Sequence, residues 1–326
     1  MRYAAHWTDA VVRAIRDETP TVRSFELVPS GGEALPYEPG AHIEVEVLVD
    51  GLPQTRSYSL IGEARPDHYR MAVKRRADST GGSIYMWSLQ PGARLAITEP
   101  LTSFAIEYDR SSYLLIAGGI GITPIVGMAQ LLARRGAVVR LLYAAHTRDE
   151  LAFARDLAAV LGDRLTCHVS AEGQRIDLAK AFAGLAPDAQ CALCGPMPML
   201  DDARRLWVAA GRSITDLRWE TFGSSGAFPA EDFTVAVPRH GVEMVVPRNR
   251  TLLDTLADAG IEVISDCRKG ECGLCALTIV SFDGRIDHRD VFLSDLQKAE
   301  NQKICACVSR AAGRIVIDTD YRPDAI

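Results

Sequence analysis

Three cysteines in one short loop constrain this chain more than any other feature. Cys267, Cys272 and Cys275 follow the spacing C-x4-C-x2-C, with Gly270 and Gly273 between them. A cluster of two irons and two sulfides takes three thiolates from such a loop and a fourth from a distant strand. Glycine permits the left-handed backbone angles that turn the N–H groups of a loop toward sulfur. Zinc sites more often combine one C-x2-C with a second pair of Cys or His, which is missing here, so the pattern favours an iron–sulfur cluster.

Two downstream cysteines compete for the fourth position. Cys305 gives the spacing C-x29-C from Cys275, and Cys307 gives C-x31-C. A strand is predicted over residues 303–308, and residues two apart on a strand point to the same side. Both cysteines therefore remain candidates on the residues alone.

Composition limits the class of protein. The chain has 326 residues, 48% hydrophobic and 24% charged, which predicts a globular protein of two or three domains. Its net charge of −6 provides no basic field for nucleic acid or an anionic membrane, and no apolar run approaches the roughly 20 residues of a membrane helix. Met1–Tyr3 lead into a polar segment without an apolar signal region, so a cytoplasmic protein is expected. Eight cysteines in such a protein indicate metal or redox chemistry rather than disulfides.

Residues 1–107 show the alternation of antiparallel strands. Every second residue from Ile43 to Val49 is apolar and β-branched, which is typical of a half-buried strand. Similar runs recur at 10–15, 21–27, 56–61, 69–74 and 94–98. Short strands joined by Gly and Pro turns predict a small closed barrel.

Two segments of this barrel suit a planar ligand that carries a phosphate. Arg56 and Tyr58 share one face of a predicted strand, where arginine can pair with phosphate and tyrosine can lie against a ring system. Gly81, Gly82 and Ser83 precede a helix predicted over 84–89, and the first N–H groups of a helix attract anions. Each motif alone also fits an ordinary strand face or an ordinary helix start.

From about residue 108 to 228, strands and helices alternate. Apolar runs predict buried strands at 113–117, 138–145, 165–169 and 190–193. One helix is expected from Pro124 to about Arg135, with Thr123 as its N-cap, and another over 150–161. This alternation favours a doubly wound parallel sheet of the α/β class.

Two glycine turns fall where predicted strands end, which is where ligands of parallel sheets bind. They are Gly118–Pro124 and Cys194–Met197. Glycine lets a pyrophosphate approach the backbone N–H groups of such turns, although neither follows the dehydrogenase pattern G-x-G-x-x-G. Cys191 and Cys194 also form a C-x2-C. A redox disulfide is the alternative there, but a free thiol in an apolar strand is ordinary core filling.

Residues 229–326 predict a mixed sheet around the cysteine loop. The small residues Gly223–Ala227 mark the expected boundary before it. Strands are expected at 233–237, 243–246, 276–282, 303–308 and 314–318. A helix is expected from Leu252 to Ala259, with Thr251 as its cap. The chain is thus expected to hold three domains, at 1–107, 108–228 and 229–326.

Five motifs, taken in order, resemble the phthalate dioxygenase reductase family of the ferredoxin-reductase superfamily. They are R-x-Y-S at Arg56–Ser59, G-G-S at Gly81–Ser83, G-G-I-G-I-T-P at Gly118–Pro124, C-G-P-x-x-M at Cys194–Met199 and C-V-S-R-A at Cys307–Ala311. The resemblance spans nearly the whole chain. It implies a multidomain protein: a flavin-binding antiparallel β-barrel, an NAD-binding doubly wound α/β domain and a C-terminal α+β ferredoxin of the β-grasp fold. It selects Cys307 over Cys305, and a longer hairpin around Ser281–Gly284 than in relatives would explain the spacing.

The resemblance assigns a role to each motif. Flavin contacts are expected from Arg56, Ser57, Tyr58, Ser59, Ala72, Val73, Lys74, Gly81, Gly82, Ser83 and Phe222. Pyridine-nucleotide contacts are expected from Gly118, Gly119, Gly121, Thr123, Pro124, Cys194, Gly195 and Pro196. Residues expected beside the hydride path are Thr123, Cys194, Glu220 and Phe222. The expected cluster ligands are Cys267, Cys272, Cys275 and Cys307.

The resemblance also implies a reductase that serves a Rieske-type oxygenase. NADH gives up two electrons together, a 2Fe-2S cluster takes one at a time, and a flavin between them can do both. FMN is expected rather than FAD, although Thr80 stands where FMN-binding relatives often carry a basic residue. NADH is expected rather than NADPH, because no grouping of Arg and Lys demands a 2′-phosphate. The protein is expected to be a monomer.

Three other functions stay open. The chain could serve a diiron hydroxylase, although those reductases usually carry the ferredoxin domain first. It could instead reduce a substrate of its own at the flavin, or be a zinc or redox-sensing module. A red-brown colour that bleaches with NADH would exclude the zinc module. The substrate of the partner belongs to the oxygenase, which this chain does not encode.

Overall fold

The structure is a computed structural model that describes residues 6–75, 79, 81–222, 228 and 230–319. It divides into two compact units, Met1–Glu220 and Thr221–Ile326. Three features named above lie outside the described residues: the segment Met1–Tyr3, Thr80 and the boundary expected at Gly223–Ala227. The division into three domains stays a prediction. In the described part of the chain, no helix has both the length and the apolar character needed to cross a membrane.

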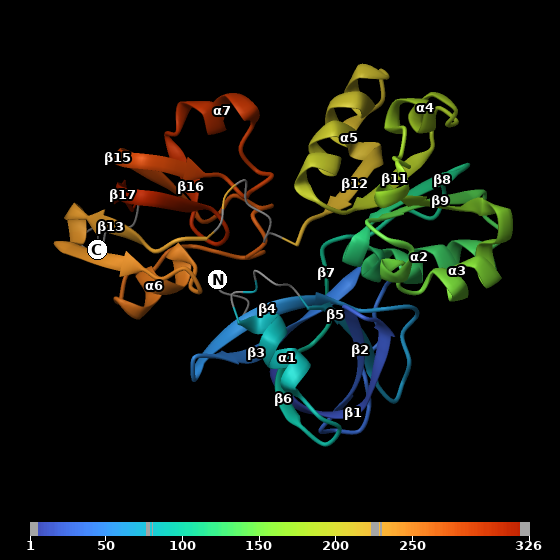
Figure 1. Cartoon of the computed structure of the whole chain (residues 1–326), viewed down its shortest axis with the longest axis horizontal. Coiled ribbons are helices and arrows are strands. Elements are labelled where there is room, and N and C mark those ends of the chain that lie inside the picture. Colours follow the sequence, from blue (N-terminus) through green and yellow to red (C-terminus); the bar gives the residue numbers. More distant parts are fainter. Residues whose placement is uncertain (1–5, 76–78, 80, 223–227, 229, 320–326) are drawn as a thin grey trace. The chain divides into compact units, whose positions relative to one another are not determined.

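The first unit begins with a curled antiparallel sheet in the order β4-β3-β6-β1-β2-β5, with β7 beside β3 (Figure 1). Its elements are β1 (Trp7–Thr19), β2 (Val22–Pro29), β3 (Ala41–Val49), β4 (Leu52–Ser59), β5 (Tyr69–Lys74), α1 (Gly82–Ser88), β6 (Arg94–Thr98) and β7 (Leu101–Thr102). The alternating residues from Ile43 to Val49 lie in its core as predicted. The two edges of the sheet meet at a bridge between Leu60 and Met71, and the predicted barrel is confirmed as a sheet that curls to this point.

A parallel sheet in the order β10-β9-β8-β11-β12 follows. Its elements are β8 (Tyr113–Gly118), α2 (Ile122–Arg134), β9 (Val139–Ala145), α3 (Ala154–Leu161), β10 (Leu165–Val169), α4 (Leu178–Ala183), β11 (Gln190–Cys194), α5 (Met197–Ala209) and β12 (Leu217–Glu220). The chain builds outward from β8 through β9 to β10 and then returns to the other side of β8. Helices α2 and α3 pack together on one face and α4 and α5 on the other (Figure 1). The doubly wound sheet is thus confirmed, and its order reverses between β8 and β11.

Two helix starts in this sheet differ from the prediction. Helix α2 begins at Ile122 with Gly121 at its N-cap, so Thr123 lies in the first turn instead of capping it. The helix expected from residue 150 begins only at Ala154, because Phe153 before it has a left-handed φ of 61°. A residue with positive φ cannot continue a right-handed helix.

Trp207 anchors the face of the sheet that α4 and α5 cover. Its side chain is fully buried and meets the ring of Phe182 edge to face, with ring centroids 5.0 Å apart. Its Nε1 donates to the Ser213 carbonyl at 2.8 Å. We expect Trp207→Ala to lower the free energy of unfolding by about 3–5 kcal/mol, because it leaves a large cavity. Denaturant unfolding followed by far-UV circular dichroism measures this.

The matched control lies on the same helix. Val208 is 57% exposed, so Val208→Ala should change stability by about 0.5 kcal/mol or less. Equal stability of the Trp207 and Val208 variants would contradict the assignment of Trp207 as an anchor.

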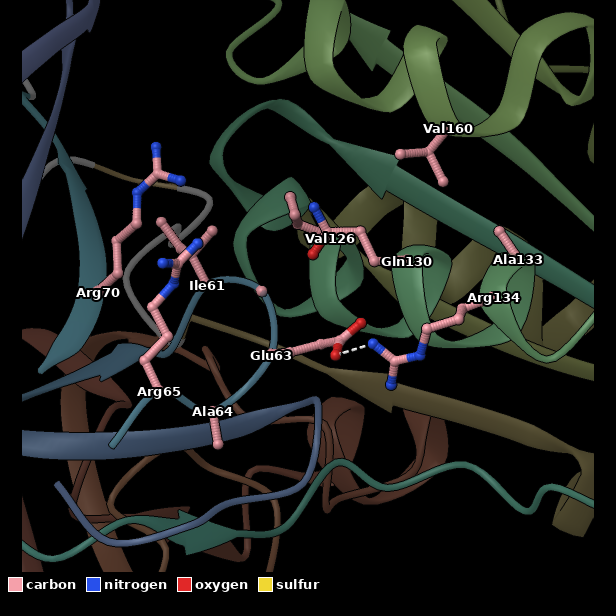
Figure 2. Close-up of a pocket in the computed structure, with 11 residues that line it drawn as sticks. Ile61, Glu63, Ala64, Arg65, Arg70, Val126, Gln130, Ala133, Arg134 and Val160 are labelled. Carbon is pink, nitrogen blue, oxygen red and sulfur yellow. Dashed lines mark hydrogen bonds and ion pairs between the residues drawn. The ribbon is translucent and has the colours of Figure 1, made fainter. Parts of the chain in front are cut away.

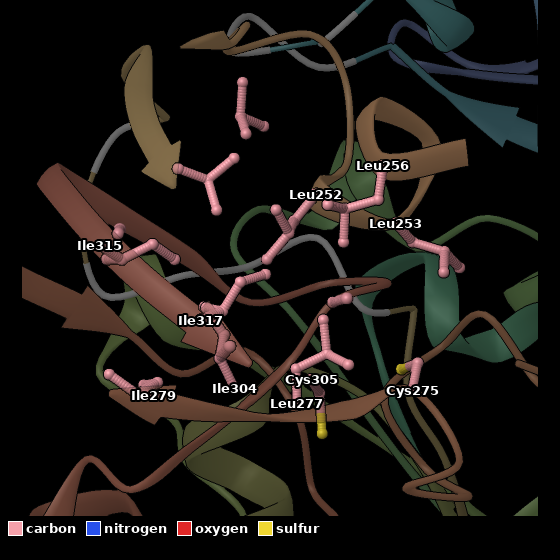
Figure 3. Close-up of a cluster of buried hydrophobic side chains, with 14 of the residues drawn as sticks. Leu252, Leu253, Leu256, Cys275, Leu277, Ile279, Ile304, Cys305, Ile315 and Ile317 are labelled. Carbon is pink, nitrogen blue, oxygen red and sulfur yellow. The ribbon is translucent and has the colours of Figure 1, made fainter. Parts of the chain in front are cut away.

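The second unit is a mixed sheet in the order β14-β13-β17-β15-β16, in which β13 and β17 are parallel (Figure 1). Its elements are β13 (Phe233–Val237), β14 (Val242–Val246), α6 (Leu252–Asp258), β15 (Ala276–Asp287), α7 (Asp295–Glu300), β16 (Lys303–Cys305) and β17 (Arg310–Asp318). Thr251 caps α6 as predicted, since its Oγ1 accepts from the Asp254 N–H at 3.0 Å. Leu252 and Leu256 of α6 pack in one core with the sheet (Figure 3).

Two predictions about the end of this unit are wrong. The strand expected over 303–308 stops at Cys305, and Cys307 lies in a turn before β17 begins at Arg310. The two thiols therefore do not share one side of a strand. The hairpin expected around Ser281–Gly284 is absent from the described structure, because these residues continue β15 and pair with β17.

Candidate functional site

The two glycine turns meet where the order of the parallel sheet reverses. Gly118 ends β8 and Cys194 ends β11, and these strands pair directly. A Cβ on Gly121 would lie 2.2 Å from the Cys194 carbonyl oxygen, and one on Gly118 would lie 2.6 Å from Pro196 Cδ. Both distances are far below van der Waals contact, so only glycine lets the turns touch. Open parallel sheets bind their ligands at such a reversal.

Thr123 and Cys194, both expected beside the hydride path, are buried at this reversal. Thr123 Oγ1 donates to the Ile120 carbonyl at 3.0 Å, which fixes its side chain inside the first turn of α2. Cys191 on the same strand as Cys194 is fully buried, and burial raises the pKa of its thiol. A protonated, enclosed thiol is inert, which agrees with its interpretation as core filling.

Arg56 is held on β4 beside the start of α1. Its Nη1 donates to the Thr55 carbonyl at 2.9 Å and its Nη2 to Gln54 Oε1 at 2.6 Å. A Cβ on Gly82 would lie 3.0 Å from Arg56 Nε, so the arginine lies against the helix start. Gly81 has a φ of 106°, which a residue with a side chain rarely adopts. The guanidinium and the N-terminal end of the helix both favour an anion.

A buried hydrogen bond joins two of the predicted motifs. Ser59 Oγ, at the end of β4, donates to Glu220 Oε2, at the end of β12, at 3.2 Å. Both side chains are buried, and Glu220 is fully enclosed. Tyr58 is half-buried on the same strand, and burial raises the pKa of its hydroxyl, which keeps it neutral. The structure thus brings the R-x-Y-S strand and the predicted Glu220 together.

The β5 residues expected to contact flavin have different surroundings. Ala72 and Val73 are buried, and the Val73 carbonyl accepts from Trp87 Nε1 at 3.1 Å. Lys74 Nζ forms an ion pair with Glu150 Oε1 at 3.1 Å. The charge of Lys74 is therefore already matched by a carboxylate.

The cysteine loop points its amide groups at a thiol. The N–H groups of Lys269, Glu271 and Cys272 each donate to Cys267 Sγ at 3.4 Å. The two glycines of the loop have left-handed φ angles of 79° and 73°. Burial raises the pKa of the Cys267 thiol, and the three hydrogen bonds oppose that rise. Amide donors aimed at sulfur are what an iron–sulfur cluster requires.

Cys275, Cys305 and Cys307 belong to the core of the second unit, and Figure 3 shows the first two of them. The Ala306 N–H donates to the Cys275 carbonyl at 3.0 Å, which joins the two segments. Hydrogen bonds from the other two thiols lower the pKa of Cys275. The same bonds, together with burial, raise the pKa of both Cys305 and Cys307.

The two candidate fourth ligands face different neighbours. The Cys307 thiol accepts from the Gly270 N–H and feels the charge of Cys267, so it faces the cysteine loop. For Cys305, the hydrogen bond with Cys275 and burial raise the pKa of the thiol, and the charge of Asp290 adds to that rise. Among the described residues, no three Cys, His, Asp or Glu side chains converge as they would around a single metal ion. The fit to a cluster therefore rests on the thiols and the amide donors.

A buried carboxylate fixes the segment next to the loop. Asp290 is fully enclosed; the Leu293 N–H donates to its Oδ2 and Ser309 Oγ to its Oδ1, each at 2.9 Å. The Val291 N–H donates to the Gly270 carbonyl at 3.0 Å. These bonds tie the segment to the cysteine loop and restrain its shape.

Comparison with known proteins decides the family. Residues 115–205 match the oxidoreductase NAD-binding domain, and residues 235–312 match the 2Fe-2S iron-sulfur cluster binding domain. The solved structure of phthalate dioxygenase reductase, described as modular for electron transfer from pyridine nucleotides to [2Fe-2S], aligns with a TM-score of 0.80 and 30% identity over 96% of this chain and 98% of that one. The chain belongs to the phthalate dioxygenase reductase family.

Relatives of this reductase serve oxygenase systems. The putative toluene-4-sulfonate monooxygenase system reductase subunit TsaB2 of Comamonas testosteroni is 35% identical over 94% of this chain and 97% of the relative. The heme-dependent oxidative N-demethylase beta subunit of Ectopseudomonas mendocina (strain ymp) is 33% identical over 95% of this chain and 97% of the relative. The chain is thus an oxidoreductase of a family of oxygenase reductase components, with NAD-binding and 2Fe-2S domains.

The family and the fold class are confirmed, whereas the individual site residues stay predictions. Phe222 belongs to the second unit, and its expected place beside the flavin stays a prediction. Partners that lie far away in the sequence, or that belong to no motif, were not predicted. Gln54 orients Arg56, and the ring of Phe292 occupies the space where a Cβ on Gly273 would stand, 2.2 Å from its Cζ. The only signal in the sequence for the contact with Phe292 was the glycine at position 273.

A separate cavity has a volume of about 650 Å³. The barrel loop that carries Glu63 and Arg65 forms one side, and α2 with Gln130 and Arg134 forms the other (Figure 2). Glu63 and Arg134 form an ion pair across it. None of the predicted cofactor contacts lines this cavity.

Proposed function

We propose that this reductase takes hydride from NADH onto FMN and passes single electrons through a 2Fe-2S cluster to a Rieske-type oxygenase. The observation that carries the proposal is the cysteine loop, whose three amide donors converge on Cys267 Sγ. The glycine turns at the reversal of the parallel sheet support a nucleotide site on the same chain. When bound, the flavin accepts an electron pair and the cluster carries electrons one at a time.

Cys267, Cys272, Cys275 and Cys307 are the proposed cluster ligands. Cys307 is preferred to Cys305 because its thiol faces Cys267 and accepts from the Gly270 N–H. The amide groups of the loop stabilise negative charge on the sulfurs, which tunes the potential of a cluster.

Arg56 and the start of α1 are the proposed phosphate site of FMN. The arginine lies against Gly82, and the Ser83 hydroxyl and the Gly81 N–H both donate to Ser79 Oγ, at 2.8 and 3.1 Å. Ser79 Oγ gathers these donors at the helix start, which supports a site for a terminal phosphate there. FAD stays the less favoured flavin.

The glycine turns are the proposed site of NADH. Gly118 and Gly121 bring the two turns into contact, and the buried Thr123 and Cys194 lie at their junction. Glu220, held by Ser59, is proposed to stand at the reacting edge of the flavin. Glu220 is the last residue of β12, so the sheet fixes the position of its backbone.

The partner is proposed to be a Rieske-type oxygenase because TsaB2 is named as the reductase subunit of a monooxygenase system. The second relative is named as a subunit of a heme-dependent oxidative N-demethylase. A haem-dependent demethylase is therefore the competing partner. A cytoplasmic monomer remains the expectation for the chain.

Anaerobic mixing of the iron-loaded protein with NADH tests the proposal. We expect the flavin absorbance and then the cluster absorbance to bleach, and added Rieske oxygenase to become reduced. Chromatography of the released flavin separates FMN from FAD. If a haem-dependent demethylase is reduced but no Rieske oxygenase is, the proposed partner is wrong. If the cluster stays oxidised with NADH, the proposed path of the electrons is wrong.

Arg56 provides a direct test of the flavin site. We expect Arg56→Gln to weaken flavin binding by about 10- to 100-fold, because a hydrogen bond to a charged group contributes about 1.5–3 kcal/mol. Flavin retained after gel filtration, and the flavin Kd by fluorescence, measure the change. Arg94→Gln is the control, since Arg94 is exposed on β6 of the same sheet. Equal flavin affinity in the two variants would remove Arg56 from the phosphate site.

A further inference from the structure

Gln54 is a buried polar side chain that uses only one end of its amide. It is 6% exposed and lies on β4, two residues before Arg56. Its Oε1 accepts from Arg56 Nη2 at 2.6 Å, whereas its Nε2 is enclosed and has no hydrogen-bond partner among the described residues. Because a buried donor without an acceptor is costly, such a nitrogen is expected to serve a partner that the chain itself does not supply.

The bond to Arg56 fixes which end of the Gln54 amide faces the guanidinium. A guanidinium has five donors and no acceptor, so the amide oxygen faces it and the amide nitrogen faces elsewhere. Turning the amide by half a turn would bring donors together and break the hydrogen bond. The amide nitrogen of Gln54 is therefore held in one direction.

The sheet places Gln54 between two contacts with the segment that starts α1. Every second pair of the β3–β4 ladder has its side chains on the same face of the sheet. Three such pairs follow one another: Val49 with Leu52, Val47 with Gln54, and Val45 with Arg56. A Cβ on Gly81 would lie 2.5 Å from Val49 Cγ1, and one on Gly82 would lie 3.0 Å from Arg56 Nε. The first and third pairs thus touch this segment, and Gln54 belongs to the pair between them.

We propose that Gln54 is a further residue of the flavin phosphate site, holding Arg56 with its amide oxygen and donating to the phosphate with its amide nitrogen. This inference rests on the proposed function, in which Arg56 and the start of α1 bind the phosphate of FMN. A phosphate oxygen accepts hydrogen bonds and pairs with a guanidinium. One phosphate would therefore engage the buried nitrogen and the oriented arginine together, and the site would prefer a phosphorylated flavin to riboflavin.

The alternative is that Gln54 only fills space beneath the sheet. It stands opposite Val47, whose side chain is fully buried. An apolar side chain of similar size would suit such a position better than an amide with an unused donor. A space-filling role therefore predicts that leucine is tolerated at position 54, and that the phosphate of the flavin makes no difference to its effect.

Equilibrium binding of two flavins to the full-length protein, freed of its own flavin, tests the inference. FMN and riboflavin are titrated separately, and flavin fluorescence gives each Kd. We expect Gln54→Leu to weaken FMN binding by about 10- to 100-fold, the range that one hydrogen bond to a charged group contributes. Riboflavin has no phosphate, so its Kd should stay at the parent value.

Gln54→Glu separates the two roles of the amide. The carboxylate can still accept from Arg56, but it has no N–H group and its charge opposes that of the phosphate. We expect FMN binding to fall at least as far as in Gln54→Leu, again with riboflavin binding retained.

Gln190→Leu is the matched control. Gln190 is also buried, and its Nε2 likewise has no partner in the part of the chain that the structure describes, but it lies on β11 of the parallel sheet. The ratio of FMN affinity to riboflavin affinity in this variant should equal that of the parent.

Each outcome decides the inference. Parent-like FMN affinity in Gln54→Leu overturns it, and so does an equal loss of FMN and riboflavin binding, which indicates damage to the barrel. Parent-like FMN affinity in Gln54→Glu overturns the contact between the amide nitrogen and the phosphate. The titrations need no NADH. A parent protein that binds FMN no more tightly than riboflavin overturns the proposed phosphate site itself, whatever the variants show.

Discussion

Cys275→Ser is expected to leave a protein that still reacts with NADH but no longer delivers electrons. Cys275 ends the C-x4-C-x2-C motif, is buried and touches both candidate fourth ligands. Loss of a ligand should cost at least the roughly 100-fold that loss of an outer-shell partner can cost a metal site. We therefore expect iron and acid-labile sulfide to fall strongly and electron delivery to a Rieske oxygenase to drop by about 100-fold or more. Flavin bleaching by NADH should persist, because the glycine turns belong to the other unit.

Cys167→Ser is the matched control for this experiment. Cys167 is a free, half-buried cysteine on β10, so the same change there should preserve both iron content and electron delivery. A Cys275 variant with the iron content and delivery rate of the parent would exclude Cys275 as a ligand. Parallel loss of flavin bleaching would indicate general damage rather than loss of the cluster.

The strands of this fold were predictable where one face is apolar. From Ile43 to Val49 the alternation alone places the core face of β3, and the run at 190–193 marks β11, whose residues are buried on both faces. Helix α5 was missed, because Met197–Ala209 carries two acidic residues and two arginines in its middle and buries only three residues. With so narrow an apolar stripe, the helix depends on packing of Trp207 rather than on its own pattern.

The boundaries that failed depend on contacts between distant segments. Thr123 has the chemistry of an N-cap, yet α2 starts two residues earlier than predicted, where Gly121 is packed against Cys194. The apolar run continues through Val308, but the chain turns after Cys305, and Cys307 lies in that turn. The local sequence predicts neither boundary, because Cys194 and the cysteine loop lie far from these segments in the sequence.

The candidate site likewise has features that the sequence predicted and contacts that it did not. The spacing of the cysteines and glycines indicated the chemistry, since a cluster and a pyrophosphate impose local requirements on the backbone. The bond between Ser59 and Glu220, and the pairing of Lys74 with Glu150, became visible only in three dimensions. Each joins segments that no local pattern connects, and each changes what a predicted residue is free to do.

Gly121→Ala is expected to separate the two glycine turns and remove most of the NADH reaction. Gly121 has an ordinary φ, so alanine suits its backbone, but the new Cβ would lie 2.2 Å from the Cys194 carbonyl oxygen. Backbone cannot yield as a flexible side chain can, and the turns must move apart. A displacement of about 1 Å in a reacting site can cost about 100-fold in rate. We expect kcat/KM for flavin reduction by NADH, measured by anaerobic stopped flow, to fall by that order, with flavin content unchanged.

Gly136→Ala separates this steric effect from a general loss of stability. Gly136 follows α2 with a φ of 70° and has open space around it, so alanine there is strained but clashes with nothing. The strain should cost about 1–2 kcal/mol, comparable to the roughly 1–3 kcal/mol of an overpacked site. If both variants unfold at similar denaturant concentrations but only Gly121→Ala loses its reaction with NADH, contact between the turns is what that reaction requires. A Gly121 variant with the kcat/KM of the parent would place the nucleotide elsewhere on the molecule.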